Sequence, residues 1–433
     1  MGENREPANP WTADDEKEHF PSLMEWWCAE VFFKTLEDNK KWSLKASFTE
    51  WRKKKTVDAI GSIFNMTLFD QDSDKYLIYC ARNESEKLIS DPDCFYIQYG
   101  DSFIKGLYPH YQMRFLDLEN HVDIKLIYRG QALPHWVAQD ITNGFLPMGL
   151  GFYRYGFIPK CEVSGTMNIK NKKFKVKGLG YFEHVWGDFS YRNPLSNPSA
   201  FKKTVSTYAK LAGWWIHHHR PSIPKTIAFS TENNPLGYDW IWALFNNGWT
   251  IFYGNILFWI TEGPIAGSLI LSKDGKNYTE FCNVSFRYNK VRYVKEYDFY
   301  YPSEIEMHAS HGMEKLSLTS RMTVKSREYI SEFPHKGYWL GLAICEAPGE
   351  IKGHYFDGRK KIKLDGICKI EAQRQISTLG HNSLRLEFLR PPKGVGISMR
   401  LKTHFFKKNL TASLQLAPTP NIRFNIHKIK NQN

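Results

Sequence analysis

Two segments of this 433-residue chain, 188 residues apart, share one framework of glycines, lysines and a glutamate. The first segment ends in GLGYFEHVWGDF, which runs from Gly178 to Phe189. The shared positions correspond in order: Gly165, Lys172, Lys173, Lys175, Gly178 and Glu183 match Gly353, Lys360, Lys361, Lys363, Gly366 and Glu371. A degenerate repeat of this period predicts a duplicated structural unit, in agreement with the two to three domains expected from the length.

The two copies differ in the side chains that follow the shared glutamate. In the first copy, Glu183 is followed by His184, Trp186 and Asp188. In the second copy no acid, imidazole or indole occupies the corresponding positions, which are Ala372, Arg374 and Ile376. This asymmetry predicts a doubled scaffold that carries a single site, in its first half.

Most of the chain alternates apolar and polar residues with a period of two, which is typical of strands with one buried face. One example is the run Val122, Ile124, Leu126 and Tyr128. Many short strands without interposed helices predict an antiparallel all-β architecture. Two tandem barrels fit both the repeat and the need to remove exposed sheet edges.

These patterns predict four parts of the chain: a disordered N-terminus at 1–18, a barrel at 19–192, a helical insertion at 193–236 and a second barrel at 237–433. The strand signals in 380–433 have no match in the first half. They either complete the second barrel or pack back onto the first.

The insertion contains apolar residues with helical spacing: Phe201, Val205, Tyr208, Ala212 and Trp215. We expect a helix that begins near residue 197 or 199 and ends before residue 221, which is a proline. Several lysines lie on its other side. Such a helix either packs on a barrel or serves as a cationic interfacial helix or a lid over a cavity.

The net charge of +13 is compatible with nucleic acid or with an anionic membrane as partner. Lys173, Lys175 and Lys177 alternate with apolar residues, which places these lysines on a solvent face. The chain has no zinc-finger spacing and no aromatic RNA-binding signature, so we expect no nucleic-acid partner. Peripheral contact with an anionic membrane stays a prediction.

Cellular location is predicted from cysteines and apolar segments. The seven cysteines include no CxxC pair, and residues 1–18 are polar and do not resemble a cleavable signal. The most apolar window, 249–271, contains Glu262, Gly263 and Pro264, which indicates two strands and a turn. These features predict a cytoplasmic protein. In one interpretation it also associates peripherally with a membrane.

The histidines do not form a convincing metal site in the sequence. His217, His218 and His219 are consecutive at the end of the expected helix, where their side chains diverge. His308 and His311 are weak candidates on a strand-like run. The sequence therefore predicts no metal and no cofactor.

Three local patterns occur in a fixed order. HFPSLMEWWCAEVFF contains Trp26 and Trp27, GLGYFEHVWGDF follows, and GYDWIWALFNNGWTIF begins the second half. Together they resemble the family of carotenoid 1,2-hydratase (hydroxyneurosporene synthase) and AttH-like proteins, over about residues 19–375. That family shows a "P…EWWY" opening, a "GxGYxDHxWG" block and a "W-x-W" start to its second half. Here Cys28 replaces the usual Tyr and Glu183 the usual Asp.

The resemblance implies two lipocalin-like barrels packed together. The family includes hydratases of isoprenoid double bonds, and related fungal members act as pericyclases on polyketide-derived chains. In the hydratases, the His and Trp of the block and a downstream Tyr and Asp are assigned to the site. By matching motif, the resemblance implies catalytic roles for His184, Trp186, Tyr238 and Asp239.

The chemistry of alkene hydration agrees with such residues. It needs a positioned acid, and burial in an apolar pocket keeps a carboxyl group protonated, which suits Asp239 or Glu183. Indole faces stabilise a carbocation. His184 can orient the carboxyl or accept a proton from water. The residues expected to line the substrate site are Trp26, Trp27, Trp240, Trp242 and Asp188, although Trp26 and Trp27 also suit a role in the barrel core.

Strand parity divides the GLGYFEHVWGDF block between two faces. His184, Trp186 and Asp188 share one face, and Glu183 lies on the other. We therefore expect the functional face to carry His184, with Glu183, which both copies retain, in a structural role.

The motifs, the aromatic content of 15% and the one-sided duplication favour one function. It is a cofactor-independent enzyme that hydrates, cyclises or isomerises an apolar isoprenoid or polyene. The alternative is a non-catalytic lipid or isoprenoid carrier that docks on membranes, because lipocalin-like barrels are natural containers.

Overall fold

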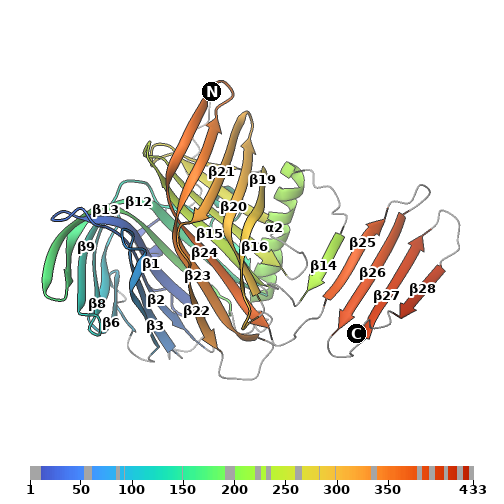
Figure 1. Ribbon diagram of the computed structural model, residues 1–433, viewed down its shortest axis with the longest axis horizontal. Helices are drawn as coiled ribbons and strands as arrows, with labels where there is room; N and C mark the ends of the chain where they lie inside the picture. The colour runs from blue at the N-terminus through green and yellow to red at the C-terminus, as the bar shows by residue number, and fades with distance from the viewer. Residues whose placement is uncertain are drawn as a thin grey trace.

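The computed structural model describes residues 11–428, apart from 53–60, 84–87, 92, 149, 191–199, 220–225, 231–235, 259–265, 282, 298, 333–338, 378–382, 390–394, 404–407 and 417–422. Three antiparallel sheets account for most of these residues (Figure 1).

The first sheet has thirteen strands, in the order β4-β3-β2-β1-β13-β12-β9-β8-β7-β6-β5, with β10 and β11 also paired to β12. Their bounds are β1 (Met24–Thr35), β2 (Lys41–Trp51), β3 (Gly61–Asp70), β4 (Lys75–Asn83), β5 (Leu88–Ser90), β6 (Tyr96–Tyr99), β7 (Ser102–Leu107), β8 (His110–Asp117), β9 (Val122–Gly130), β10 (His135–Trp136), β11 (Phe145–Met148), β12 (Gly151–Ile169) and β13 (Lys172–Asp188). A short helix, α1 (Gln139–Thr142), lies between β10 and β11.

The second sheet has ten strands, in the order β18-β17-β16-β15-β24-β23-β21-β20-β19, with β22 paired to β23. Their bounds are β15 (Leu236–Phe245), β16 (Thr250–Phe258), β17 (Ala266–Ser272), β18 (Tyr278–Phe281), β19 (Asn283–Val294), β20 (Phe299–His311), β21 (Glu314–Met322), β22 (Arg327–Glu332), β23 (Trp339–Phe356) and β24 (Lys361–Ser377).

The two sheets share the same strand order around their first strand and their long hairpin, which confirms the prediction of two tandem lipocalin-like barrels. The repeated framework falls on their longest hairpins, β12-β13 and β23-β24. In each barrel the last strand of this hairpin pairs with the first strand of the barrel, β13 with β1 and β24 with β15. The duplication read from the sequence is therefore a duplication of structure.

The repeated glycines allow neighbouring strands to approach closely. A Cβ atom at Gly178 would lie 2.1 Å from the carbonyl oxygen of Phe32, and one at Gly366 would lie 2.2 Å from that of Leu244. We expect Gly178→Ala to lower the free energy of unfolding by about 1–3 kcal/mol because the backbone must shift. Urea denaturation measures this change. Gly213→Ala is the control, since a Cβ atom there would meet no atom within 4 Å apart from its chain neighbours and its own helix backbone. An equal loss in both variants would contradict the explanation.

Because side chains alternate along each strand, β1 and β15 contribute to two kinds of apolar core. Trp27 of β1 and Ile241 of β15 lie inside the first and second barrels, respectively. Their chain neighbours Trp26 and Trp240 point to a third apolar cluster, which lies between the barrels. The outer faces of β1 and β15 are therefore buried as well, and the two barrels share an interface.

The N-terminal segment was expected to be disordered, but its described part, residues 11–18, is ordered. A 3-10 helix, η1 (Ala13–Asp15), begins it, and Glu16 is buried. The indole N–H of Trp27 donates a hydrogen bond to the backbone oxygen of Glu16 at 3.1 Å. The backbone N–H of Tyr108 donates to the Glu16 carboxylate at 3.0 Å. These buried polar contacts fix the segment against the first barrel.

The insertion forms α2 (Phe201–His219), as its periodicity predicts. The buried face of this helix differs from the expected one. Phe201 and Val205, which were expected to be buried, are 51% and 46% exposed. The buried side carries Thr204, whose hydroxyl donates to the backbone oxygen of Leu150 at 2.8 Å. Within the described residues, no helix combines the length and the apolarity that a membrane crossing requires.

The end of the chain forms a third sheet, in the order β14-β25-β26-β27-β28. Its strands are β14 (Thr226–Ser230), β25 (Ser383–Leu389), β26 (Val395–Thr403), β27 (Lys408–Leu416) and β28 (Arg423–Lys428). Figure 1 shows this sheet beyond α2, apart from the two barrels. The C-terminal strands thus neither complete the second barrel nor wrap onto the first, because they pair with a strand from the insertion.

Candidate functional site

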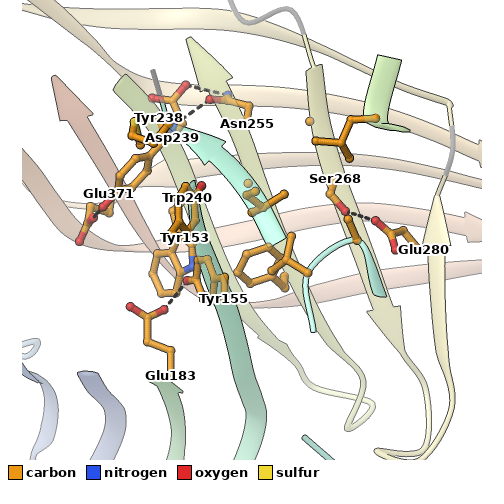
Figure 2. A pocket seen from close by; sticks show the side chains of 18 of the residues that line it. Tyr153, Tyr155, Glu183, Tyr238, Asp239, Trp240, Asn255, Ser268, Glu280 and Glu371 are labelled. Atoms are coloured by element: carbon orange, nitrogen blue, oxygen red, sulfur yellow. Dashed lines mark hydrogen bonds between the residues drawn. The ribbon is translucent and has the colours of Figure 1, made fainter. Parts of the chain in front are cut away.

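A cavity of about 180 Å³ lies between the two barrels (Figure 2). Both halves line it, through β1, β12 and β13 of the first barrel and β15, β16 and β24 of the second, and α2 adds Leu211 and Trp214. Its apolar wall includes Val137, Ile141, Leu146, Met148 and Phe252. A largely apolar cavity with a few polar groups is the usual form of a small-molecule site.

The glutamates of the repeat, Glu183 and Glu371, both line this cavity. The indole N–H of Trp26 donates to Glu183 at 3.1 Å, and the hydroxyl of Tyr238 donates to Glu371 at 2.7 Å. Trp26 and Tyr238 hold equivalent positions, each two residues before the strand partner of the glutamate. The shared framework therefore builds matching carboxyl groups on both sides of the interface.

Glu183 lies at the centre of an aromatic hydrogen-bond network. Tyr181 donates to its carboxylate at 2.8 Å, and the hydroxyl of Tyr155 makes a second bond to the same oxygen. Burial raises the pKa of Glu183, although the three donors oppose this rise. Tyr155 also lines the cavity, so its hydroxyl links the Glu183 carboxyl to the cavity wall.

Glu371 belongs to a buried cluster of charges at the interface. Lys45 of the first barrel binds Glu371 and lies 2.7 Å from Glu346 of the second. Lys369 lies 3.1 Å from Glu30. Burial and the nearby Glu346 raise the pKa of Glu30 to about 8. These pairs join the two barrels on one side of the cavity.

Glu280 of β18 lies on another side of the cavity, and Figure 2 shows it well separated from Glu183. The hydroxyl of Ser268 donates a hydrogen bond to it at 2.7 Å. Burial raises the pKa of Glu280 from 4.5 to about 7. Sequence reasoning missed this residue, because it stands in a short strand outside the three motifs and carries no local signal.

Asp239 lines the cavity, as the sequence predicts, but both of its oxygens are already engaged. The Arg374 guanidinium lies 2.6 Å from one oxygen. The side-chain amide of Asn255 donates to the other at 2.8 Å, and Tyr288 also donates to it. Asp239 therefore has little capacity to present a proton to a ligand. Its neighbour Tyr238 reaches the cavity as expected.

His184 and Trp186 lie outside the cavity lining, contrary to expectation. His184 is fully buried inside the first barrel, where its ring stacks on Trp27 at 4.8 Å between centroids. Burial lowers its pKa. Parity correctly separates His184 from Glu183, but the face of β13 that meets the cavity is the one that carries Glu183. The reason is that the cavity lies between the barrels, and the outer face of β13 meets it.

The remaining predicted residues divide between cavity and core. Trp26 and Trp240 line the cavity. Trp27 is fully buried in the core of the first barrel, and Trp242 is fully buried in the apolar cluster between the barrels. Asp188 is outside the cavity lining. Thus Trp26 and Trp27, which are neighbours on one strand, have different surroundings, as alternation requires.

The fold and the cavity between its halves define the chain as a double-lipocalin protein. Among solved structures, a putative AttH from Nitrosomonas europaea aligns with a TM-score of 0.55 and 14% identity, over 84% of this chain and 98% of that one. Kievitone hydratase from Nectria haematococca aligns with a TM-score of 0.56 and 11% identity, over 85% and 93%. The chain shares the fold of these AttH-like proteins. No family model and no curated protein sequence matches it.

Proposed function

We propose that this protein is a cofactor-independent enzyme that protonates a carbon–carbon double bond of an apolar isoprenoid or polyene. The outcome is hydration, or a related cyclisation or isomerisation. The observation that carries this proposal is Glu280, a carboxyl group with a pKa of about 7 in the wall of a largely apolar cavity. An acid whose pKa lies near the working pH is the most effective proton donor.

In the proposed reaction, the Glu280 proton forms a C–H bond with one alkene carbon and leaves a carbocation on the other. Attack by water forms the C–O bond, and the water proton returns to the Glu280 carboxylate. The acid is thereby regenerated without a redox step. Loss of a proton to the Glu280 carboxylate in place of water attack gives isomerisation. Attack by a second double bond forms a ring and moves the positive charge to another carbon, and loss of a proton from the ring cation to the carboxylate then completes a cyclisation.

The aromatic lining suits this cationic intermediate. Trp26, Trp240 and Tyr153 all border the cavity, and the face of an aromatic ring attracts a cation. The Glu183–Tyr155 pair supplies a polar anchor for an oxygen of the substrate or for the attacking water. The shared fold with kievitone hydratase agrees with a hydratase, while the activity itself rests on the cavity chemistry.

The experiment is incubation with candidate isoprenoids and polyenes, followed by mass spectrometry of the products. A gain of one water supports hydration, and a product of unchanged mass with altered retention supports cyclisation or isomerisation. Stoichiometric recovery of unchanged ligand from every candidate would favour the alternative of a carrier.

The rate should depend on pH through the protonated form of Glu280. Because burial raises its pKa to about 7, the acid is mostly protonated below this pH and ionised above it. We expect kcat to fall as pH rises through about 7, by tenfold for each further unit. A pH profile of product formation measures this limb. A limb near pH 4.5, or none, would show that another group donates the proton.

A further inference from the structure

Three metal-ligating side chains converge in the first barrel, on the face of β13 that is turned away from the cavity. Nε2 of His184 lies 2.8 Å from Oε1 of Glu25, and Nδ1 of His19 lies 3.2 Å from the same oxygen. All three ligand atoms lie within 4.8 Å of one another. They come from β13, β1 and the N-terminal segment, and none of these residues lines the cavity.

The hydrogen bonding of His184 leaves one nitrogen for a ligand. Its Nδ1 lies 2.7 Å from the backbone oxygen of Asp15, which can only accept a hydrogen bond. The Nδ1 atom must therefore carry hydrogen, and Nε2 points at Glu25. Histidines that bind metals usually donate their second N–H to a carbonyl or carboxylate, which fixes the tautomer and the ring orientation.

Both imidazole rings are held by indoles. His184 stacks on Trp27, and His19 stacks on Trp186 with 3.7 Å between centroids and 11° between planes. The side chains of Glu25 and His184 are fully buried, whereas that of His19 is 24% exposed. The cluster is thus preorganised, and His19 is the ligand of the three that solvent reaches.

We propose that His19, Glu25 and His184 bind a divalent transition metal of the Zn²⁺ class, with water as the fourth ligand. Two histidines and a carboxylate are an established Zn²⁺ ligand set. Ligand atoms in a tetrahedral Zn²⁺ site lie roughly 3.3 Å apart, given bonds of about 2.0–2.1 Å. The two separations from Glu25 Oε1, 2.8 and 3.2 Å, would open slightly, and the two histidine nitrogens, which lie within 4.8 Å of each other, would move to a similar spacing.

The metal stabilises the attachment of the N-terminal segment to the barrel. His19 follows the segment whose Glu16 and Asp15 backbone oxygens accept bonds from Trp27 and His184. A metal shared by His19, β1 and β13 links this segment to both strands. Its role is structural, and it is separate from the proposed proton transfer by Glu280.

The test uses full-length protein that a chelator has freed of metal, with Zn²⁺ alone as the probe. We expect one Zn²⁺ bound per cluster by calorimetry, a rise in Tm, and visible absorption typical of tetrahedral Co²⁺ when Co²⁺ replaces Zn²⁺. His19→Ala should weaken Zn²⁺ binding at least tenfold and remove the Co²⁺ absorption. Since His19 is partly exposed, this variant should fold even if replacements of His184 do not.

The matched control removes the competing histidines 217–219. Their triple alanine variant should keep the bound Zn²⁺ and the Tm rise, while any additional weak binding to that run is lost. Absence of stoichiometric Zn²⁺ binding to the wild type would overturn the proposal. Equal Zn²⁺ affinity in the wild type and His19→Ala would also overturn it. That result would mean that His19 only hydrogen-bonds to Glu25 and does not bind the metal.

Discussion

Glu280→Gln is expected to reduce kcat by about 10²–10⁴-fold, the usual contribution of a general acid. Glutamine keeps the size of the side chain and can still accept the hydrogen bond from Ser268, which is 2.7 Å long in the wild type. It cannot transfer a carboxyl proton. The measurement is product formation under saturating substrate, with KM determined separately. Because the cavity shape is retained, KM should change much less than kcat.

Two controls make this result specific. Glu119→Gln removes an exposed carboxyl in a turn of the first barrel and should leave kcat unchanged. Glu183→Gln tests the polar anchor and should raise KM, with a smaller loss of kcat than Glu280→Gln. Wild-type kcat in Glu280→Gln would exclude Glu280 as the acid, and a larger loss in Glu183→Gln would transfer that role to Glu183.

Arg374→Met is expected to lower the free energy of unfolding by about 3–5 kcal/mol, because it leaves the Asp239 carboxylate buried without its charge partner. Both side chains are fully buried, and the guanidinium nitrogen lies 2.6 Å from the carboxylate oxygen. Arg374 also donates to the backbone oxygen of Tyr238 at 2.8 Å, next to the cavity. Chemical denaturation with matched slopes measures the loss.

The exposed pair of Arg321 and Glu350 provides the comparison. The side chain of Arg321 is 53% exposed, so Arg321→Met should cost less than about 1 kcal/mol. The double variant Asp239→Leu with Arg374→Met should recover much of the stability, since it removes both buried charges. Equal losses in the two arginine variants, or no recovery in the double variant, would contradict a coupled buried pair.

Arg374 also shows a limit of what the repeated sequence could predict. It occupies the position of Trp186 in the second copy, and the sequence suggests that this half has lost its chemistry. In the structure, Arg374 secures Asp239, which lines the cavity. Long-range pairing of this kind brings together residues 135 positions apart, and local patterns contain no sign of it.

The sequence by itself determined the duplication, the antiparallel strands and the helix in the insertion, because periodicity and repeated glycines express local geometry. It also determined that Glu183 and His184 point to opposite faces. Only the tertiary structure decided which face meets the cavity, since that depends on where the second barrel packs. The outer faces of β1, β13 and β15 enclose the cavity, and Glu280 enters it from β18. Alternation fixes which residues share a face, whereas packing between barrels fixes what that face meets.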